Sequence, residues 1–227
     1  MDEGFAGQVG PIAALAEPSR RALYLFVVSQ PSAVSREQVA EGVDLPLHSV
    51  KFHLDRLVEE GLLEVEFRRL SGRTGPGAGR PAKLYRRAPR QLSVSLPERR
   101  YDLAGEVLAE AIDRAMRENV AVSKSVQDAA SAQGRRIAAT ASTKGTQLER
   151  ATTLLERHGY EPRRSAEEIV LANCPFDSLV QGHMELVCRL NQSLIGGALE
   201  GLGCPGLETV LAPEPGRCCV KVRRSRA

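Results

Sequence analysis

The apolar positions in the first 60 residues recur at helical intervals and predict three short helices. One helix is expected over residues 19–29, where the apolar residues form a single stripe. A second is expected after Ser35, because Ser35 and Gln38 fit a capping box, in which each side chain bonds to the other residue's backbone N–H. A third is expected over residues 46–60, and Gly61 suits the left-handed residue that commonly follows a helix.

After Gly61 the period of the apolar residues changes from helical to alternating. Residues 63–68 alternate apolar and polar side chains, which predicts a strand. Residues 71–81 are rich in glycine and proline and predict a loop, and residues 83–86 predict a returning strand. Three helices followed by a two-stranded hairpin with a long loop form the order of a winged helix-turn-helix.

The rest of the chain predicts a second, mixed region. The expected elements are helices over 99–119, 121–142 and 147–158, a strand over 168–173, a helix over 179–202, and strands over 208–211 and 217–223. The fold class predicted is therefore α+β, in three parts. These are a winged helix-turn-helix DNA-binding domain over 1–97, linking and dimerisation helices over 98–146, and a mixed α/β, cysteine-bearing sensor domain over 147–227.

The long helix over 99–119 carries an apolar stripe that is a candidate dimer seam. The stripe consists of Leu103, Val107, Leu108, Ile112, Ala115 and Met116. Such a stripe packs either into the core of its own chain or against a second copy. We expect a homodimer.

Composition is that of an ordinary globular protein. Of the 227 residues, 42% are hydrophobic and 26% are charged, so the chain can bury a core. The longest apolar run, residues 22–28, is too short to cross a membrane. The acidic start, with Asp2 and Glu3, does not resemble a secretory signal. A cytoplasmic protein without membrane contact is expected.

Positive charge is concentrated around the predicted wing. The formal net charge is +3, but residues 67–100 alone carry ten lysines and arginines and one glutamate. Clustered basic residues beside a helix-turn-helix are typical of a protein that binds the phosphates of double-stranded DNA. A solvated basic linker is the alternative interpretation.

The exposed face of the third predicted helix offers side chains suited to the major groove. Ser49 can reach a phosphate or a base, Lys51 and Arg56 suit phosphate or guanine, and Phe52 can contact a thymine methyl group. His53 falls nearer the buried boundary, so a structural role is expected for it.

The predicted wing adds three basic candidates. Arg80 stands between Gly79 and Pro81, and an arginine in such an extended segment can enter a narrow minor groove or neutralise a phosphate. Arg73 and Lys83 are expected to bind phosphate without reading sequence.

All five cysteines fall in the last quarter of the chain. They are Cys174, Cys188, Cys204, Cys218 and Cys219. Their wide spacing differs from the Cys-x-x-Cys pairs of zinc ribbons and suits ligands carried by separate elements. Thiolates select zinc, copper(I) or iron–sulfur clusters, whereas buried cysteines without a ligand role are the alternative. Strand alternation places Cys218 on the face of Val220 and Val222, and Cys219 on the opposite face.

Three segments resemble the ArsR/DeoR-type winged-helix regulators: SREQVAEGVDLPLHSVKFHLDRLVEEGLLEVEFRR, GRPAKLYRR and ERRYDLAGEVLAEAI. The closest resemblance is to the branch typified by the iron–sulfur-sensing repressor of the suf operon. This resemblance implies a homodimeric repressor whose operator binding depends on an iron–sulfur cluster, [4Fe-4S] in type. By position it implies Cys174, Cys188 and Cys218 as ligands. Cys204 is the candidate fourth ligand, and Cys219 and His183 are alternatives.

Three other interpretations remain open. A winged-helix regulator could hold zinc or an apolar effector in place of a cluster. An enzyme could use a cysteine nucleophile, with His183 as base and Asp177 as orienting group near Cys174, although a binding protein without catalytic activity is expected. A winged helix used only for protein contacts would show no salt-dependent DNA affinity.

Overall fold

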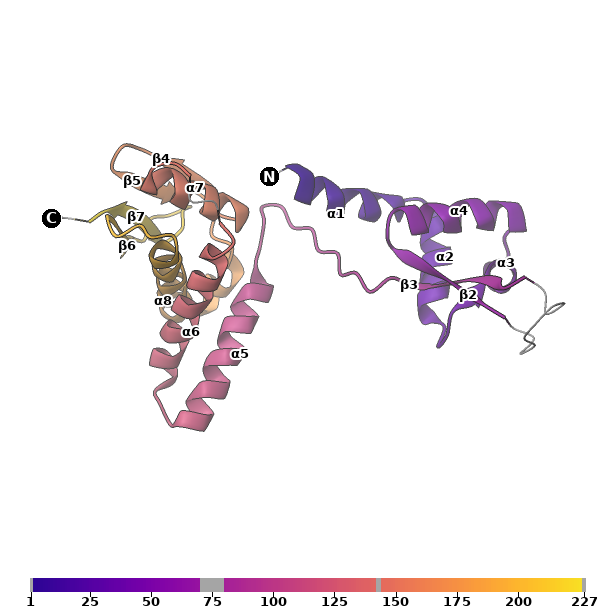
Figure 1. The fold of residues 1–227 in the computed structure, drawn as a ribbon, viewed down its shortest axis with the longest axis horizontal. Coiled ribbons are helices and arrows are strands. Elements are labelled where there is room, and N and C mark those ends of the chain that lie inside the picture. Colours follow the sequence, from indigo (N-terminus) through magenta and orange to yellow (C-terminus); the bar gives the residue numbers. More distant parts are fainter. Residues whose placement is uncertain (1, 70–79, 142–143, 226–227) are drawn as a thin grey trace. The chain divides into compact units, whose positions relative to one another are not determined.

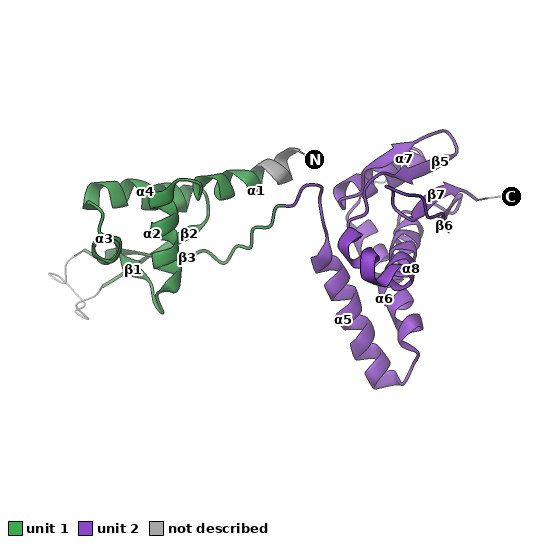
Figure 2. Cartoon of the chain, turned by 180° about the vertical axis from the view of Figure 1, so that it is seen from behind, with its two compact units in different colours: residues 1–94 green, residues 95–227 purple. Residues whose placement is uncertain are grey.

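The computed structural model describes residues 2–69, 80–141 and 144–225. The chain forms two compact units, Met1–Val94 and Ser95–Ala227, which are coloured separately in Figure 2. The helices expected as a separate linking segment over 98–146 belong to the second unit, because their buried faces pack on the C-terminal elements.

The first unit contains four helices (Figure 1). They are α1 (Asp2–Ala14), α2 (Pro18–Ser29), α3 (Arg36–Val43) and α4 (Leu47–Glu59). The sequence analysis did not predict α1. The capping box at the start of α3 is present, since the Ser35 hydroxyl accepts from the Gln38 backbone and the Gln38 side chain accepts from the Ser35 backbone. Gly61 has a φ of 69°, the left-handed conformation expected after α4.

Three antiparallel strands complete the first unit. They are β1 (Val34–Ser35), β2 (Leu63–Arg68) and β3 (Ala82–Arg87), in the order β1-β3-β2. Tyr85 of β3 pairs with Val34 on one side and Val65 on the other. The side chain of Tyr85 is buried, and it joins the core formed by the inner faces of α2, α3 and α4.

The second unit combines four helices with a four-stranded antiparallel sheet. The helices are α5 (Tyr101–Glu118), α6 (Val122–Ala138), α7 (Gln147–Arg157) and α8 (Asp177–Gly201). The strands are β4 (Pro162–Arg164), β5 (Glu168–Leu171), β6 (Leu207–Leu211) and β7 (Val220–Arg224), in the order β4-β5-β7-β6. The last strand begins three residues later than expected, so Cys218 and Cys219 precede it.

Helices α6 and α8 approach closely because glycines stand where they cross. A Cβ on Gly197 of α8 would lie 2.0 Å from the carbonyl oxygen of Ser131 on α6, and one on Gly134 of α6 would lie 2.0 Å from that of Leu194. Two apolar cores flank this contact, one under the sheet and one between α5, α6 and α8.

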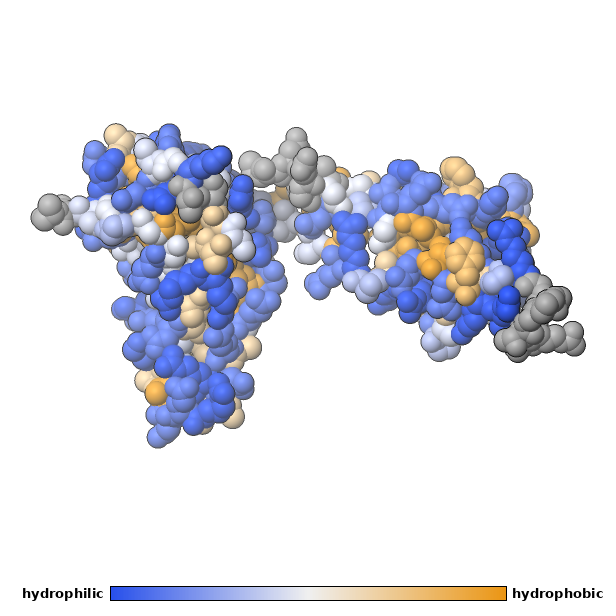
Figure 3. All heavy atoms as spheres, in the orientation of Figure 1, coloured by the Kyte–Doolittle hydropathy of each residue, from blue (hydrophilic) through white to orange (hydrophobic). Residues whose placement is uncertain are grey.

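The apolar stripe of α5 divides into two parts. Leu103 and Val107 are buried in the core of their own chain, whereas Ile112 and Met116 are 50% and 79% exposed. Intrachain packing therefore uses the first half of the predicted dimer seam. On the face drawn in Figure 3, hydrophilic residues cover most of the second unit. Within the described residues, no helix has the length and apolar character to cross a membrane.

Candidate functional site

The orientation of α4 is fixed by its apolar stripe. Val50, Leu54 and Leu57 are fully buried against the core of the first unit, so the opposite face of the helix is turned to solvent. Phe52 on that face is 66% exposed. Phe67 on β2 is equally exposed, so it is the position of Phe52 among the basic residues of α4 that makes this face a candidate binding surface.

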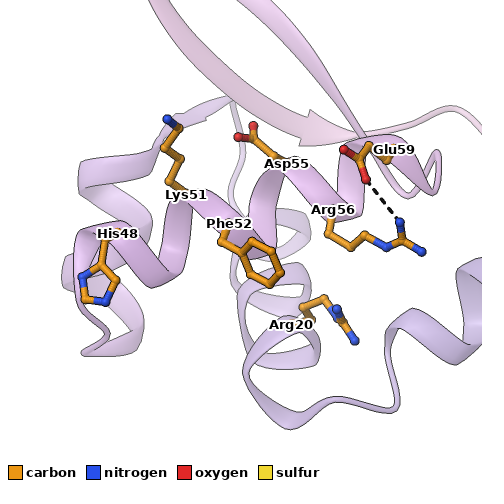
Figure 4. Close-up of a pocket in the computed structure, with 7 residues that line it drawn as sticks. All are labelled: Arg20, His48, Lys51, Phe52, Asp55, Arg56 and Glu59. Carbon is orange, nitrogen blue, oxygen red and sulfur yellow. Dashed lines mark hydrogen bonds and ion pairs between the residues drawn. The ribbon is translucent and has the colours of Figure 1, made fainter.

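The exposed face of α4 lines an open groove (Figure 4). The groove is formed by Arg20 of α2 together with His48, Lys51, Phe52, Asp55, Arg56 and Glu59 of α4. Three of the four residues predicted on this helix, Lys51, Phe52 and Arg56, are in the groove. Ser49 is half-buried and is not among the lining residues. The sequence analysis missed Arg20, because the packing of α2 against α4 brings it there.

The charged groups of the groove differ in how far they are compensated. Arg56 forms ion pairs with Glu59 at 3.2 Å and Glu60 at 2.5 Å. Lys51 is exposed and, within the described part of the chain, has no hydrogen-bond or ion-pair partner. Lys51 is therefore the groove cation most available to a phosphate.

The wing candidates have three different outcomes. Arg73 lies outside the described residues. Arg80 is exposed at the start of the returning segment. The Lys83 ammonium donates to the Asp55 carboxylate at 2.7 Å and lies 5.1 Å from the centre of the Tyr85 ring. The hydrogen bond to Asp55 raises the pKa of Lys83. Lys83 therefore neutralises a carboxylate of α4. Its surroundings favour this ion pair over the phosphate contact that the sequence predicted.

His53 lies behind the groove. Its side chain is largely buried, its ring meets the edge of Phe52 at a centroid distance of 5.3 Å, and its Nδ1 lies 3.7 Å from the Glu17 carboxylate. Glu17 itself caps α2 by accepting from the backbone of Ser19 and Arg20, and these bonds lower its pKa. His53 thus stands between α2 and α4.

In the second unit, three separate segments bring four cysteines together. Cys174 precedes α8, Cys188 lies within α8, and Cys218 and Cys219 precede β7. All four are free thiols. Cys174 and Cys218 are hydrogen-bonded to each other, as are Cys188 and Cys219.

These contacts make the thiols unequal. The Cys218 thiol donates to Cys174, which lowers the pKa of Cys174 and, together with burial, raises that of Cys218 well above its usual range. Burial and the hydrogen bond to Cys219 raise the pKa of Cys188 to about 12. The lowered pKa of Cys174 favours its use as a thiolate ligand or nucleophile.

A buried polar pair supports the cysteines. The Asn191 amide of α8 donates to the Cys218 sulfur at 3.2 Å, and the Tyr160 hydroxyl donates to the Asn191 side-chain oxygen at 2.5 Å. Both Asn191 and Tyr160 are almost completely buried. Buried polar groups without partners are costly, so this chain of bonds fixes the position of Cys218.

Cys204 lies away from the other four. It follows the end of α8, and the 13 helical steps from Cys188 to Gly201 rise about 20 Å. The Cys204 sulfur is close to the carbonyl oxygens of Gln147 and Leu202, and burial raises its pKa. Cys219, the alternative fourth ligand, interacts with Cys188, so the geometry favours Cys219 over Cys204, and the ligand itself stays a prediction.

Cys219 was expected on the outer face of a strand. The alternation of burial continues just before β7, since Cys218 is buried, Cys219 is half-buried and Val220 is buried again. The half-buried thiol of Cys219 interacts with Cys188. His183, the candidate base of the enzyme interpretation, is exposed at a kink of α8, where its φ is −140°. Asp177, the candidate orienting group, lies 3.8 Å from Arg99.

The four thiols suit a soft metal by their chemistry, since thiolates bind zinc, copper(I) and iron–sulfur clusters. They stand in two hydrogen-bonded pairs rather than around one point. Across the described ranges, no group of three or more His, Cys, Asp or Glu side chains is arranged to hold a metal ion. Ligation by all four cysteines would thus require the pairs to part.

None of the curated proteins or solved structures matched the chain. Residues 15–66, from the end of α1 to β2, match the family model described as a helix-turn-helix domain. This segment includes α4 and every residue that lines the groove. The first unit therefore contains a helix-turn-helix domain, the element by which DNA-binding transcription regulators contact their operators.

Proposed function

We propose that the chain is a transcriptional repressor that binds double-stranded DNA as a homodimer and responds to a metal centre held by its cysteines. The proposal assigns DNA contact to Lys51, Phe52 and Arg56 of the groove and to Arg80. It is supported by the exposed Phe52 and the uncompensated Lys51 on the helix-turn-helix. Two copies would present two α4 helices to successive major grooves of a palindromic operator.

The metal centre proposed is an iron–sulfur cluster, [4Fe-4S] in type, with Cys174, Cys188, Cys218 and Cys219 as ligands. The single observation that carries this proposal is the meeting of four thiols from three segments. Such a cluster would make the protein sensitive to oxidants, because oxidants break the cluster down. Its loss leaves free thiols. With the centre bound, the cysteines link α8 to the segments before α8 and β7; without it, the links are hydrogen bonds only.

Binding rather than catalysis is proposed for the thiols. Cys174, whose pKa is lowered, is hydrogen-bonded to another thiol, and among the described residues no base is bonded to its sulfur. A cysteine nucleophile is usually activated by a neighbouring histidine, and His183 is exposed to solvent.

Zinc is the second candidate, and the closeness of the thiols favours it. Zinc–sulfur bonds of about 2.3 Å in a tetrahedron hold the sulfurs about 3.8 Å apart. Within each pair the thiols interact with each other, and binding of zinc would bring the two pairs around one point. The same four cysteines would then form a structural site without redox chemistry.

Metal analysis distinguishes the candidates. The visible absorption of anaerobically purified protein is measured, with iron, sulfide and zinc assayed on the same sample. A broad band near roughly 400 nm with about four irons and four sulfides per chain supports the cluster, and one zinc in a colourless protein supports the alternative. Neither metal, even after reconstitution, contradicts both.

Two matched variants test the ligand set. Cys219→Ser is expected to lower the metal content, whereas Cys204→Ser, at the far end of α8, is expected to leave it unchanged. The opposite result would assign the fourth position to Cys204. The DNA assignment is tested separately by fluorescence anisotropy with a DNA duplex over a range of NaCl concentrations, because binding through phosphate contacts must weaken as salt rises.

A further inference from the structure

We propose that Arg99 and Asn173 are positioning residues that connect the thiol group of Cys174 to the segment entering from the first unit. The inference rests on the proposed function, since it concerns how the state of the cysteines reaches the DNA-binding unit. It is carried by a set of hydrogen bonds between residues 98–100 and residues 173–175, all within the second unit.

The entering segment is bonded directly to the residues on either side of Cys174. The Arg99 guanidinium donates to the Cys174 carbonyl oxygen at 2.9 Å and to the Asn173 side-chain oxygen at 2.5 Å. The Arg100 backbone N–H donates to the Pro175 carbonyl oxygen at 3.0 Å. A further ion pair joins Arg99 to Asp177 at 3.8 Å.

Asn173 makes this contact specific. Its side chain is buried, and its amide donates to the carbonyl oxygens of Glu98 at 3.1 Å and Gly159 at 2.6 Å while its oxygen accepts from Arg99. All these groups are satisfied only when the entering segment and the Cys174 segment lie in one register. Moving either segment alone would leave buried polar groups unpaired, at a substantial cost.

The connection to the first unit is short. Leu92 packs against the core of the first unit, and Arg90 donates to the Gly7 carbonyl oxygen at 2.8 Å. The Ser95 hydroxyl already accepts from the Arg99 backbone at 2.8 Å in the second unit. The three Cα–Cα steps from Leu92 to Ser95 span at most about 11 Å, so the chain between the two units is short.

Backbone hydrogen exchange tests the connection. The exchange rate of the amides of residues 98–101 is measured before and after two changes at the thiols. One is loading with iron and sulfide. The other is alkylation by iodoacetamide, in which the Cys174 sulfur bonds to the CH₂ carbon, iodide leaves and the thiol proton passes to water. In the wild-type chain both changes are expected to alter the exchange rate by at least about threefold.

Three variants identify the residue responsible. Arg99→Ala is expected to lose the response while its metal content stays that of the wild type, and Arg99→Lys is expected to retain part of it, because a lysine can still donate to one carbonyl oxygen. Arg100→Ala is the matched control: its side chain lies near Glu98 and Asp102, and its backbone bond to Pro175 remains. It is expected to respond like the wild type.

The two proposals fail in different ways. If the wild-type chain takes up no iron or zinc but alkylation changes the exchange of residues 98–101 through Arg99, the metal proposal is wrong and the connection holds. An Arg99→Ala chain that responds like the wild type and the Arg100→Ala control would overturn the connection, whatever the metal content. The connection would also be overturned if neither metal loading nor alkylation changed the amide exchange rates of residues 98–101 in the wild-type chain.

Discussion

Asp55 of α4 and Lys83 of β3 form an ion pair at 2.7 Å across the first unit. This pair ties the base of the wing to the helix that lines the groove. The Tyr85 hydroxyl lies 3.5 Å from the same Asp55 oxygen, so the carboxylate is shared by two residues of β3. Lys83, which the sequence predicted to bind phosphate, thus has a charge that is already compensated.

Removing the Asp55 charge is expected to strengthen DNA binding. In Asp55→Asn, the Lys83 ammonium becomes available to a phosphate, and a negative charge leaves the groove. The plot of log affinity against log salt concentration should steepen by about 1, the value for one added phosphate contact. The free energy of unfolding should change by no more than about 1 kcal/mol, because both side chains are substantially exposed.

The reciprocal variant is the control for this effect. Lys83→Gln leaves Asp55 uncompensated in the groove and is expected to weaken binding. Anisotropy titrations with one DNA duplex at several NaCl concentrations measure both variants. An unchanged salt dependence in Asp55→Asn would mean that Lys83 does not reach the DNA.

Phe52→Ala is expected to weaken binding to a preferred DNA sequence about tenfold, the loss of an apolar contact with a base edge. Phe67→Ala on β2 is the matched control, since both phenylalanines are 66% exposed and only Phe52 lines the groove. Neither variant should lose much stability, because neither ring is buried. Equal losses of DNA affinity would contradict the assignment of the groove. The preferred DNA sequence used for these titrations is first selected with the wild-type protein from a random library of duplexes.

The helix-turn-helix was predictable because its signals are local. The Ser35 capping box and Gly61 after α4 each depend on a few neighbouring residues, and both have the predicted form. Strand β2 forms where alternation predicted it, although its burial does not alternate, since Phe67 is 66% exposed. The pair of Lys83 with Asp55 was not predictable. It depends on the register of β3 against β2 and on the rotation of α4, which only the packed core determines.

The cysteine group shows where spacing ceases to be informative. Regular intervals between cysteines predicted that Cys204 would join the others, but the 13 helical steps of α8 from Cys188 to Gly201 rise about 20 Å before the chain reaches Cys204. Alternation placed Cys218 on the face of Val220 and Val222, and all three are buried. It did not indicate that the half-buried thiol of Cys219 meets Cys188 of α8, because that contact depends on tertiary packing.

Gly197→Ala is expected to destabilise the second unit, although alanine is normally the better helix former by about 1 kcal/mol. The added Cβ would lie 2.0 Å from the Ser131 carbonyl oxygen, a backbone atom that can move only if α6 and α8 separate. Gly105→Ala on α5 is the control, because a Cβ there meets nothing within 4 Å. Urea unfolding should show a loss for Gly197→Ala of about 2 kcal/mol or more and a small gain for Gly105→Ala.

His158 is expected to make the second unit less stable in mild acid. Burial, assisted by Arg100 and Arg157, lowers the pKa of His158 below its ordinary value of 6.5, and its buried Nδ1 has no hydrogen-bond partner among the residues that the structure describes. The unfolded chain therefore binds more protons than the folded one, so stability is full above about pH 6.5 and declines as the pH falls toward the lowered folded-state pKa. His158→Gln should flatten this decline in urea unfolding curves, whereas His183→Gln, at an exposed site, should not. An equal decline in wild type and His158→Gln would assign the pH dependence to other groups.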